Sequence, residues 1–452
     1  MKLKIPASLR KTAHTLLGHG YAAFLVGGAV RDQLLDRTVQ DFDIATDARP
    51  ETIMKLFKRV VPTGLKHGTV TVLCRDHQYE ITTFRTESTY TDFRHPDEVQ
   101  WSGSIDEDLR RRDFTINAIA CNLDTGQLYD PFDGQSDIKC KIIRAIGNPL
   151  ERFQEDPLRT IRACRFSAQL DFSIEQATQN AMKKTAPLIQ HISEERIRDE
   201  FVKIMGSPLP SSGIKKLEES GLLTFILPEL DACRGIGQGE MHSFDVYTHS
   251  LYSSDFPPKD AVGVRIAALF HDIGKADTMV VGEHEEIRFY GHEKKSREYT
   301  NNILSRLKFP NKEIHHITHL VLNHMFHYEP SWSDAAVRRF IHRVGQENIQ
   351  DLILLRRADQ YGMNRQSMDS PLLNEFQMRI DSLLEQQHVL SLKDLAVDGS
   401  DIMEYLNIPA SPQIGLILHE LMETVLDDPS LNTRQKLLGI AKEFYKNRLS
   451  VS

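Results

Sequence analysis

Two carboxylates near the start of the chain form a pattern that suits metal-dependent chemistry. Asp41 and Asp43 stand two residues apart in the segment QDFDIAT. On a β-strand, residues two apart point to the same face, so this pair would repel unless a cation lay between the carboxylates. Magnesium prefers carboxylate oxygens and keeps coordination positions open for substrate phosphates. Two such ions about 4 Å apart activate an attacking hydroxyl and stabilise a leaving pyrophosphate.

A glycine turn precedes the acidic pair. Gly27 and Gly28 follow the segment YAAFLV, which is typical of a buried strand, and Arg31 comes three residues after Gly28. Two adjacent glycines let backbone N–H groups approach a triphosphate, and Arg31 adds positive charge to that contact. An Asp-x-Asp pair alone is most often solvated surface. Together with the glycine turn and Arg31, it predicts a site for a nucleoside triphosphate.

Five segments follow one another in an order that matches a known family. They are LVGGAVRDQLLDRTVQDFDIAT (Leu25 to Thr46), LRRRDFTINAIA (Leu109 to Ala120), YDPFDGQSDI (Tyr129 to Ile138), EDPLRTIRACRF (Glu155 to Phe166) and EERIRDEF (Glu194 to Phe201). They resemble the motifs of class II nucleotidyltransferases, which include tRNA CCA-adding enzymes and bacterial poly(A) polymerases. Because all five occur in the family's order, chance is a poor explanation.

The resemblance implies roles for residues of the first two motifs. Asp41 and Asp43 would bind the catalytic magnesium ions. The residues expected at the nucleotide are Gly28, Arg31, Arg112 and Asp113, with Asn117 nearby. Glu80, on the expected strand YEITTFR, is a candidate third acid, and an ordinary surface carboxylate of a hairpin is the equal alternative.

The fourth motif carries one acid and three arginines at intervals of three residues. They are Asp156, Arg159, Arg162 and Arg165. On one helix they would drift slowly around a broad face. A carboxylate beside a guanidinium imitates the Watson–Crick edge of a base, because the acid accepts from an exocyclic amine and the arginine donates to a ring nitrogen or carbonyl. CTP and ATP carry such an amine, so Asp156 and Arg159 are expected to select the base, as the protein template of this family is thought to do.

The other charged residues of these motifs have simpler alternatives. Arg162 and Arg165 are expected at a phosphate or at the other edge of the base. Arg159 would otherwise form an ion pair with Glu155 at i, i+4, worth about 0.2–0.5 kcal/mol. Arg196 and Arg198 of the fifth motif are expected only to brace the helices.

The polar segment from Arg85 to Leu109 is rich in turn-forming residues and is typical of a mobile loop. By resemblance, CCA-adding and A-adding members carry a flexible loop here, and members that add only CC lack it. The segment therefore argues against a CC-only enzyme and leaves the other two activities open.

The second half of the chain holds another set of potential metal ligands. LFHDIGKADT resembles the paired His-Asp signature of HD-domain phosphohydrolases, and imidazole with carboxylate suits a divalent metal that activates water. By resemblance, the first ligand set would be His249, His271, Asp272 and Asp359, and a second position would be completed by His292 and His324. Such a domain would be a phosphatase or cyclic phosphodiesterase of RNA ends, or would be kept for structure or dimer contacts.

Several residues of this region are not assigned to the metal. Lys275 would either steady a phosphate or be exposed. The remaining histidines are expected to be ordinary core or surface residues, namely His284, His315, His316, His319 and His327.

The whole chain indicates more than one domain, because 452 residues exceed one ordinary core. Early segments mix strand and helix patterns: TVTVLCRDHQYEITTF reads as a hairpin and ETIMKLFKRV has helical spacing, whereas helical periodicity prevails from Glu151. The expected fold is an α/β nucleotidyltransferase head with a mixed sheet, an all-α neck, an HD-type helical body and a helical tail. The expected boundaries are 1–147, 148–230, 231–375 and 376–452.

Two further segments bear on this division. ACRGIGQGEMHSFD, at the start of the body, is Gly-rich and is expected to be a linker. The basic segment RQKLLGIAKEFYKNRLS of the tail either contacts tRNA phosphates or is a solvated amphipathic helix.

Composition narrows the class of protein. The net charge of −8 argues against wholesale coating of nucleic acid but is compatible with a local basic groove. Five scattered cysteines without a Cys-x-x-Cys pattern predict a reducing cytoplasm and no zinc knuckle. No apolar run is long enough for a membrane span, and no signal peptide is expected, so the partners would not include a membrane.

The sequence therefore predicts template-independent transfer of CMP and AMP from CTP and ATP to the 3′ end of tRNA. The RNA 3′ hydroxyl would attack the α-phosphate, and pyrophosphate would leave. An A-adding enzyme using ATP only and a poly(A) polymerase are alternatives within the class. An HD metal-dependent phosphohydrolase acting on RNA ends, with the head as a relic, is the alternative from another class. The oligomeric state stays open.

Overall fold

The computed structural model describes residues 3–39, 41–65, 68–74, 77–88, 98–239, 243–282, 286–366, 370–386 and 391–449. The chain forms two compact units. The first comprises Met1–Ala232 with Arg306–Phe309, and the second comprises Cys233–Ser305 with Pro310–Ser452. The finer division into four domains stays a prediction.

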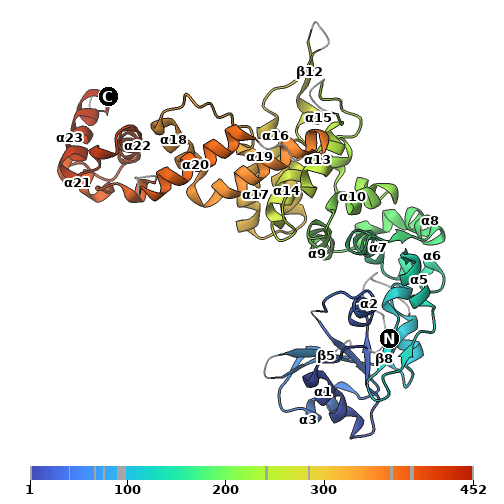
Figure 1. The fold of residues 1–452 in the computed structure, drawn as a ribbon. Coiled ribbons are helices and arrows are strands. Elements are labelled where there is room, and N and C mark those ends of the chain that lie inside the picture. Colours follow the sequence, from blue (N-terminus) through green and yellow to red (C-terminus); the bar gives the residue numbers. More distant parts are fainter. Residues whose placement is uncertain are drawn as a thin grey trace. The chain divides into compact units, whose positions relative to one another are not determined.

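The first unit begins with a seven-stranded mixed sheet in the order β3-β4-β5-β2-β1-β8-β9 (Figure 1). Strands β2 and β5 are parallel, and the other neighbouring pairs are antiparallel. The strands are β1 (Phe24–Val26), β2 (Asp43–Thr46), β3 (Val60–Gly64), β4 (Thr69–Leu73), β5 (Gln78–Thr83), β8 (Ala120–Asn122) and β9 (Leu128–Tyr129). The helices of this part are α1 (Ala7–Leu17), α2 (Gly28–Leu34), α3 (Pro50–Leu56), α4 (Ile105–Arg110) and α5 (Gly134–Cys140). Buried Leu25, Ile44 and Ile81 lie on adjacent strands of its core.

The expected strand before the glycine turn and the expected β4–β5 hairpin are confirmed. The helical prediction for ETIMKLFKRV holds only to Leu56, where α3 ends. Phe57 takes an extended backbone conformation, and β-branched Val60 and Val61 then favour the strand β3.

The segment between Arg85 and Leu109, expected to be a mobile loop, forms regular structure at both ends. Strand β6 (Arg85–Ser88) pairs with antiparallel β7 (Glu98–Trp101), and α4 begins at Ile105. Residues 89–97 lie outside the described part of the chain.

The rest of the first unit is helical. Its helices are α6 (Pro149–Glu155), α7 (Leu158–Leu170), α8 (Gln176–Thr185), α9 (Glu194–Met205), α10 (Pro210–Glu219), α11 (Leu223–Ile226) and α12 (Pro228–Asp231). One short parallel pair, β10 (Ile142–Ile143) with β11 (Ser173–Ile174), accompanies them. The expected mixed-sheet head followed by a mostly helical chain is confirmed.

The second unit is built from helices and one two-stranded ribbon. The helices are α13 (Val246–Asp255), α14 (Val262–Phe270), α15 (Lys275–Thr278), α16 (His292–Arg306), α17 (Asn311–Asn323), α18 (Asp334–Val344), α19 (Ile349–Asn364), α20 (Pro371–Glu385), α21 (Gly399–Leu406), α22 (Pro412–Asp427) and α23 (Arg434–Phe444). The ribbon pairs β12 (Met279–Val281) with antiparallel β13 (Ile287–Phe289). This ribbon was not predicted from the sequence. Among the described residues, no helix is long and apolar enough to cross a membrane.

Two predictions about connecting and terminal segments are confirmed. The described residues of the Gly-rich segment 232–245 form no helix or strand. The tail is helical, and α21, α22 and α23 share a core that includes fully buried Ile402, Leu421 and Leu437.

Candidate functional sites

Three carboxylates meet at the parallel strand pair of the first unit. Asp43 opens β2 and is the register partner of Glu80 on β5, so both side chains point to the same face of the sheet. Partial burial, followed by the charge of Glu80, raises the pKa of Asp43 to about 6; Asp41 adds to this and Arg112 opposes it. A divalent cation relieves such repulsion, so this donor set fits magnesium.

The placement of Asp41 differs from the prediction. Strand β2 begins at Asp43, so Asp41 lies in the preceding loop and not on the strand. The register of β2 and β5 therefore brings Asp43 together with Glu80. Asp41 lies in the loop that precedes β2.

The glycine turn brings the main chain close to this acidic group. Gly27 has φ +70°, and a Cβ there would lie 3.1 Å from Arg112 Nη1 and 3.8 Å from Asp43 Oδ2. A side chain would therefore be strained and would fill the space between these two groups. Arg112 is held from behind, because its Nη2 donates to Asp108 Oδ2 at 3.1 Å and Asp108 is fully buried. Gly28 begins α2 directly after the turn.

A chain of polar contacts joins helix α2 to helix α7. Arg31 Nη1 donates to Asn117 Oδ1 at 2.6 Å, and Asn117 Nδ2 donates to Asp113 Oδ1 at 3.0 Å. Arg162 of α7 then donates to Asp113 Oδ2 through Nε at 2.8 Å and Nη2 at 2.5 Å. Burial alone would raise the pKa of Asp113, but Arg162 and the Asn117 hydrogen bond lower it to about 2.

The same chain of contacts continues to helix α9, because Arg162 Nη1 lies 4.0 Å from Glu200 Oε1. Arg165 Nε lies 2.7 Å from Glu200 Oε2, and both residues are buried. Burial lowers the pKa of Arg165 to about 10, against the opposing charge of Glu200. Glu200 was not singled out in the sequence; its signal was the spacing of EERIRDEF, which places it on the buried face of α9.

The expected single helix from Asp156 to Arg165 is wrong at its start. Asp156 ends α6 with an extended backbone (φ −142°, ψ 97°), and α7 begins at Leu158. Pro157 is the cause, because a residue that precedes proline is driven out of the helical region. The three arginines do lie on α7, and Asp156 stands at the junction of the two helices.

The two residues expected to select the base are held by separate partners. Asp156 Oδ2 accepts from Arg196 Nη2 at 3.0 Å. Arg159 donates through Nη1 to Glu155 Oε2 at 2.9 Å and through Nη2 to the Arg111 carbonyl at 3.1 Å. The ion pair with Glu155 is thus present, although it spans the junction. Arg196, expected only to brace the helices, contacts Asp156 directly.

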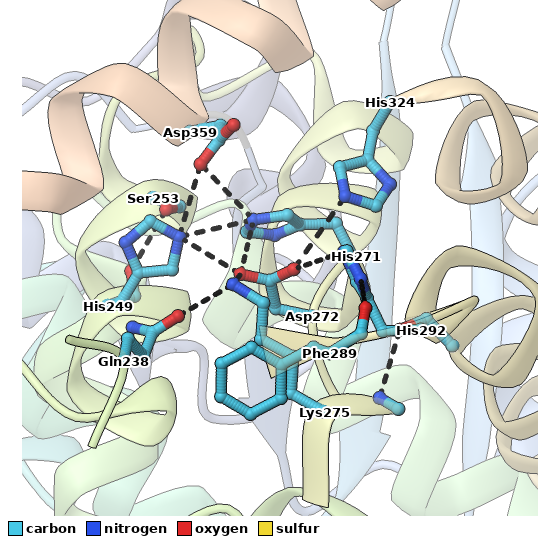
Figure 2. Close-up of polar contacts among 12 residues, drawn as sticks. Gln238, His249, Ser253, His271, Asp272, Lys275, Phe289, His292, His324 and Asp359 are labelled. Carbon is cyan, nitrogen blue, oxygen red and sulfur yellow. Dashed lines mark hydrogen bonds and ion pairs between the residues drawn. The ribbon is translucent and has the colours of Figure 1, made fainter. Parts of the chain in front are cut away.

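In the second unit, six side chains gather into one group, called here the His–Asp cluster. Its members are His249 of α13, His271 and Asp272 after α14, His292 of α16, His324 after α17, and Asp359 of α19. Figure 2 shows their imidazoles and carboxylates pointing toward one another. All six residues predicted as HD-type ligands are therefore brought together.

Asp272 divides the cluster into two positions. Its Oδ2 lies 3.5 Å from His249 Nε2 and 3.3 Å from His271 Nε2, and Asp359 Oδ1 lies 3.2 and 3.5 Å from the same nitrogens. Its other oxygen, Oδ1, lies 3.3 Å from His292 Nε2 and 3.7 Å from His324 Nε2. Ligand atoms about 2.1 Å from one metal stand about 3.0–3.4 Å apart, so these spacings fit a divalent cation on each side of Asp272.

The imidazoles are oriented by the main chain. The Nδ1 atoms of His271, His292 and His324 lie 2.7–3.0 Å from the carbonyls of Ala268, Phe289 and Val321. A carbonyl only accepts, so each Nδ1 carries the proton and each Nε2 faces the cluster. This is the second-shell arrangement of metal-bound histidines. The Nε2 atoms of His292 and His324 are buried and make no hydrogen bond with the described residues.

The two carboxylates of the cluster favour positive charge on the groups around them. Burial would lower the pKa of His271, but Asp272 and Asp359 raise it to about 10. The pKa of Asp272 lies well below its usual value, because His271 and Lys275 outweigh its burial. Lys275 is buried rather than exposed, and its Nζ lies 2.6 Å from Asp272 Oδ2.

Two glycines allow the helices that carry cluster residues to pack closely. A Cβ on Gly362 of α19 would collide with Ser253 Oγ of α13, and a Cβ on Gly274 would lie 2.5 Å from the Ser296 amide of α16. These contacts seat α19 and α16, and with them Asp359 and His292, against the rest of the site.

The other described histidines of this region stay outside the cluster. His316 contacts Asn348 and Asp351, and His319 Nε2 donates to the Val344 carbonyl. His315 stacks on His319, and His327 lies on the surface beside Glu329. His284 lies outside the described residues.

Comparison with known proteins agrees with the first unit and extends along the chain. The family model of the poly A polymerase head domain matches residues 23–144. The model of the RNA and SrmB binding site of polymerase A matches residues 171–234, and that of tRNA nucleotidyltransferase domain 2 matches residues 292–441.

Individual relatives cover nearly the whole chain. The CCA-adding enzyme of Bacillus cytotoxicus is 35% identical and aligns over 95% of this chain and 96% of its own length. That of Enterococcus faecalis is also 35% identical, over 98% of each chain. The crystal structure of the Bacillus stearothermophilus CCA-adding enzyme in complex with CTP superposes with a TM-score of 0.74 at 29% identity, covering 97% of each chain. This chain therefore belongs to the family of CCA-adding enzymes and is a tRNA nucleotidyltransferase.

Proposed function

We propose that this chain builds or repairs the CCA terminus of tRNA, with CTP and ATP as substrates, and that Asp41 and Asp43 hold two magnesium ions at the reaction centre. The observation that carries the proposal is the group of Asp41, Asp43 and Glu80, in which burial, followed by the charge of Glu80, raises the pKa of Asp43 to about 6. Magnesium, when bound, supplies the charge that activates the attacking 3′ hydroxyl and stabilises the departing pyrophosphate. Glu80 is the third acid of this centre.

The residues around the acidic group hold the triphosphate. Gly27 leaves space between Arg112 and Asp43, and this space admits phosphate oxygens next to a guanidinium. Asp113 and Asn117 are fixed by Arg162 and Arg31, which presents their polar atoms in one arrangement beside the nucleotide sugar. Arg165 supports the same network through Glu200.

Asp156 and Arg159 select the base from the junction of α6 and α7. Asp156 accepts from the exocyclic amine of cytosine or adenine, and Arg159 donates to the neighbouring ring atom. Uracil and guanine present a carbonyl where Asp156 needs a donor. The Bacillus stearothermophilus relative is a CTP complex, which supports this substrate class.

A nucleotide-addition assay tests this function. Purified protein receives tRNA transcripts that end before CC, after the first C and after CC, each with CTP, ATP or both. Growth of all three to CCA is expected, and the Asp41→Ala, Asp43→Ala double variant is expected to add nothing. If only the CC-ended transcript is extended, the protein is an A-adding enzyme. If a long series of A residues is added, the protein is a poly(A) polymerase.

A second activity is favoured by a separate observation, the two-sided placement of Asp272 between His249–His271 and His292–His324. We propose that the second unit is an HD-type metal centre that hydrolyses phosphate from RNA 3′ ends. A divalent cation, when bound, supplies an activated water for this hydrolysis. Lys275, which touches Asp272, provides positive charge for the phosphate.

Phosphatase and phosphodiesterase assays test the second activity. Hydrolysis of p-nitrophenyl phosphate, of a 2′,3′-cyclic phosphate or of an RNA 3′-phosphate is expected with one of magnesium, manganese, nickel or cobalt. No hydrolysis of any of these with any metal would overturn it and leave a structural role for the cluster.

These functions fit a division into a catalytic head (1–147), a neck (148–230), a metal-binding helical domain (231–375) and a tail (376–452). The five cysteines are all free, which supports a reducing cytoplasm as the compartment.

A further inference from the structure

The β12–β13 ribbon is anchored at the His–Asp cluster by both of its ends. Its first strand follows α15, whose Lys275 Nζ contacts Asp272 Oδ2. Its second strand ends at Phe289, whose carbonyl accepts from His292 Nδ1 at 3.0 Å. The Phe289 ring lies 5.3 Å from Lys275 Nζ, and both are drawn beside the cluster in Figure 2. The ribbon is thus an extension of the metal centre's wall.

Large apolar side chains of β12 and of the residue that follows β13 are exposed. Val280, Val281 and Tyr290 are 51%, 58% and 65% exposed. The ribbon has two strands only, and such a ribbon gains little stability by itself. Large apolar side chains exposed together next to a candidate active site indicate a binding surface.

Two exposed side chains supply this surface with an aromatic ring and a positive charge. Arg288 and Tyr290 are two residues apart, and Arg288 Nη1 donates to the Tyr290 hydroxyl at 2.9 Å. An aromatic ring beside a guanidinium is the combination that binds single-stranded nucleic acid, since the ring stacks on a base and the cation contacts phosphate. Tyr290 follows Phe289 directly, so its Cα lies about 3.8 Å from that of a residue touching the cluster.

We propose that the β12–β13 ribbon is the RNA-binding wall of the metal centre, in which Tyr290 stacks on the 3′-terminal base and Arg288 contacts the adjoining backbone phosphate. This inference rests on the phosphohydrolase proposed above. The substrate is a single-stranded RNA end that carries a 3′-phosphate. Water attacks phosphorus, the bond from phosphorus to O3′ breaks, O3′ takes a proton, and inorganic phosphate leaves. The product has the free 3′ hydroxyl that the head requires.

The first test compares two substrates on the full chain with the same metal. One is a short RNA with a 3′-phosphate, and the other is p-nitrophenyl phosphate, which has no base to stack. Tyr290→Ala is expected to lower kcat/KM for the RNA by about tenfold or more, mainly through KM, and to leave p-nitrophenyl phosphate within about twofold. Tyr290→Phe keeps the ring and is expected to restore the RNA value. Tyr405→Ala, which removes another exposed tyrosine of the same unit, is the matched control.

A second test needs no turnover. An RNA with a photoreactive 4-thiouridine at its 3′ end is irradiated with the chain in EDTA. The crosslink is expected at the ribbon and is expected to be lost in Tyr290→Ala.

The outcomes separate the two proposals. If the wild type hydrolyses both substrates and Tyr290→Ala changes neither, or if the crosslink lies away from the ribbon, the RNA-binding wall is wrong and the phosphohydrolase stands. If the wild type hydrolyses neither substrate with any metal, the phosphohydrolase fails, and the ribbon's role as its wall fails with it.

Discussion

Asp43 and Glu80 are register partners in a parallel strand pair, and their carboxylates face the same side of the sheet. The sequence separates them by many residues and a hairpin, yet the charge of Glu80 is second only to burial in raising the pKa of Asp43. Glu80 is exposed on β5, and its position beside Asp43 makes it the candidate third acid of the acidic group.

Glu80→Gln removes this charge while it keeps the size of the side chain. The magnesium concentration for half-maximal nucleotide addition is expected to rise by roughly tenfold or more, as for losses of groups that support a metal. Glu51→Gln, an exposed acid on α3, is the control. A magnesium requirement unchanged in Glu80→Gln would remove Glu80 from the reaction centre.

The raised pKa of Asp43 predicts how activity depends on pH. In its proposed role Asp43 would bind magnesium only when ionised, and without metal its pKa is about 6. Protons and magnesium therefore compete, so at limiting magnesium the rate is expected to fall below about pH 6. More magnesium should move this fall to lower pH. A pH profile that does not move with magnesium concentration would contradict this competition.

Asp113 and Arg162 predict a pH-dependent contribution to stability. The folded-state pKa of Asp113 is about 2, against 3.8 as its ordinary value. A lowered pKa stabilises the fold above the ordinary value, and this stabilisation is lost as pH falls from about 4 toward 2. The difference of about two units corresponds to about 2.5 kcal/mol. Asp113→Asn is expected to lose about this much free energy of unfolding at pH 7 and clearly less at pH 3, as measured with urea.

The exposed loop residue Asp124 provides the control for that experiment, because Asp124→Asn removes a charge without an ion pair in the described structure. If Asp113→Asn lowers the free energy of unfolding equally at pH 7 and pH 3, the Asp113–Arg162 ion pair is not the cause of the loss.

Arg196 predicts an effect on nucleotide choice. Because Arg196 holds Asp156 Oδ2, Arg196→Ala should free the carboxylate that we propose reads the amine of the base. A lost hydrogen bond between charged groups corresponds to about 1.5–3 kcal/mol, so kcat/KM for CTP and ATP is expected to fall about tenfold or more, while UTP incorporation changes little. Single-nucleotide addition with all four triphosphates measures this ratio.

Arg198→Ala is the matched control, since Arg198 lies on the same helix and contacts its neighbour Asp199. Arg196→Lys should recover part of the ratio. Equal losses in the Arg196→Ala and Arg198→Ala variants would assign Arg196 to bracing alone.

The His–Asp cluster predicts metal content. His324 lies beside Asp272 Oδ1 only, on the side shared with His292. His324→Ala is expected to lower the bound metal from about two ions to one per chain, measured by elemental analysis, with CCA addition unchanged. His319→Ala, outside the cluster, should keep both ions. Equal metal content in the His324→Ala variant and the wild type would contradict the second position.

The order of residues along the chain predicted the mixed-sheet head and the mostly helical remainder of the fold. The glycine turn and the spacing of Asp41 and Asp43 are local signals that pointed to the acidic group. The six residues that the second unit brings together are scattered along the chain, and they were named through the resemblance to HD domains.

The features that were not predicted depend on contacts between segments that are far apart in the sequence. Asp43 and Glu80 lie side by side because of the register between β2 and β5, and this register cannot be read from either segment alone. Glu200 and Arg196 act through helix packing. Pro157 is a local signal for the break between α6 and α7. It was overlooked because Asp156 and the three arginines that follow recur every three residues, which suggested one continuous helix. The β12–β13 ribbon was missed because each strand has three residues, too few for a clear alternation.

The most direct measurement crosses two variants with two assays. The Asp41→Asn, Asp43→Asn variant and the His271→Ala, Asp272→Asn variant are each tested for CCA addition to tRNA and for hydrolysis of an RNA 3′-phosphate. The first variant is expected to lose nucleotide addition and keep hydrolysis, and the second to do the reverse. Retention of CCA addition by the Asp41→Asn, Asp43→Asn variant would contradict the assignment of the reaction centre to the acidic group of the head.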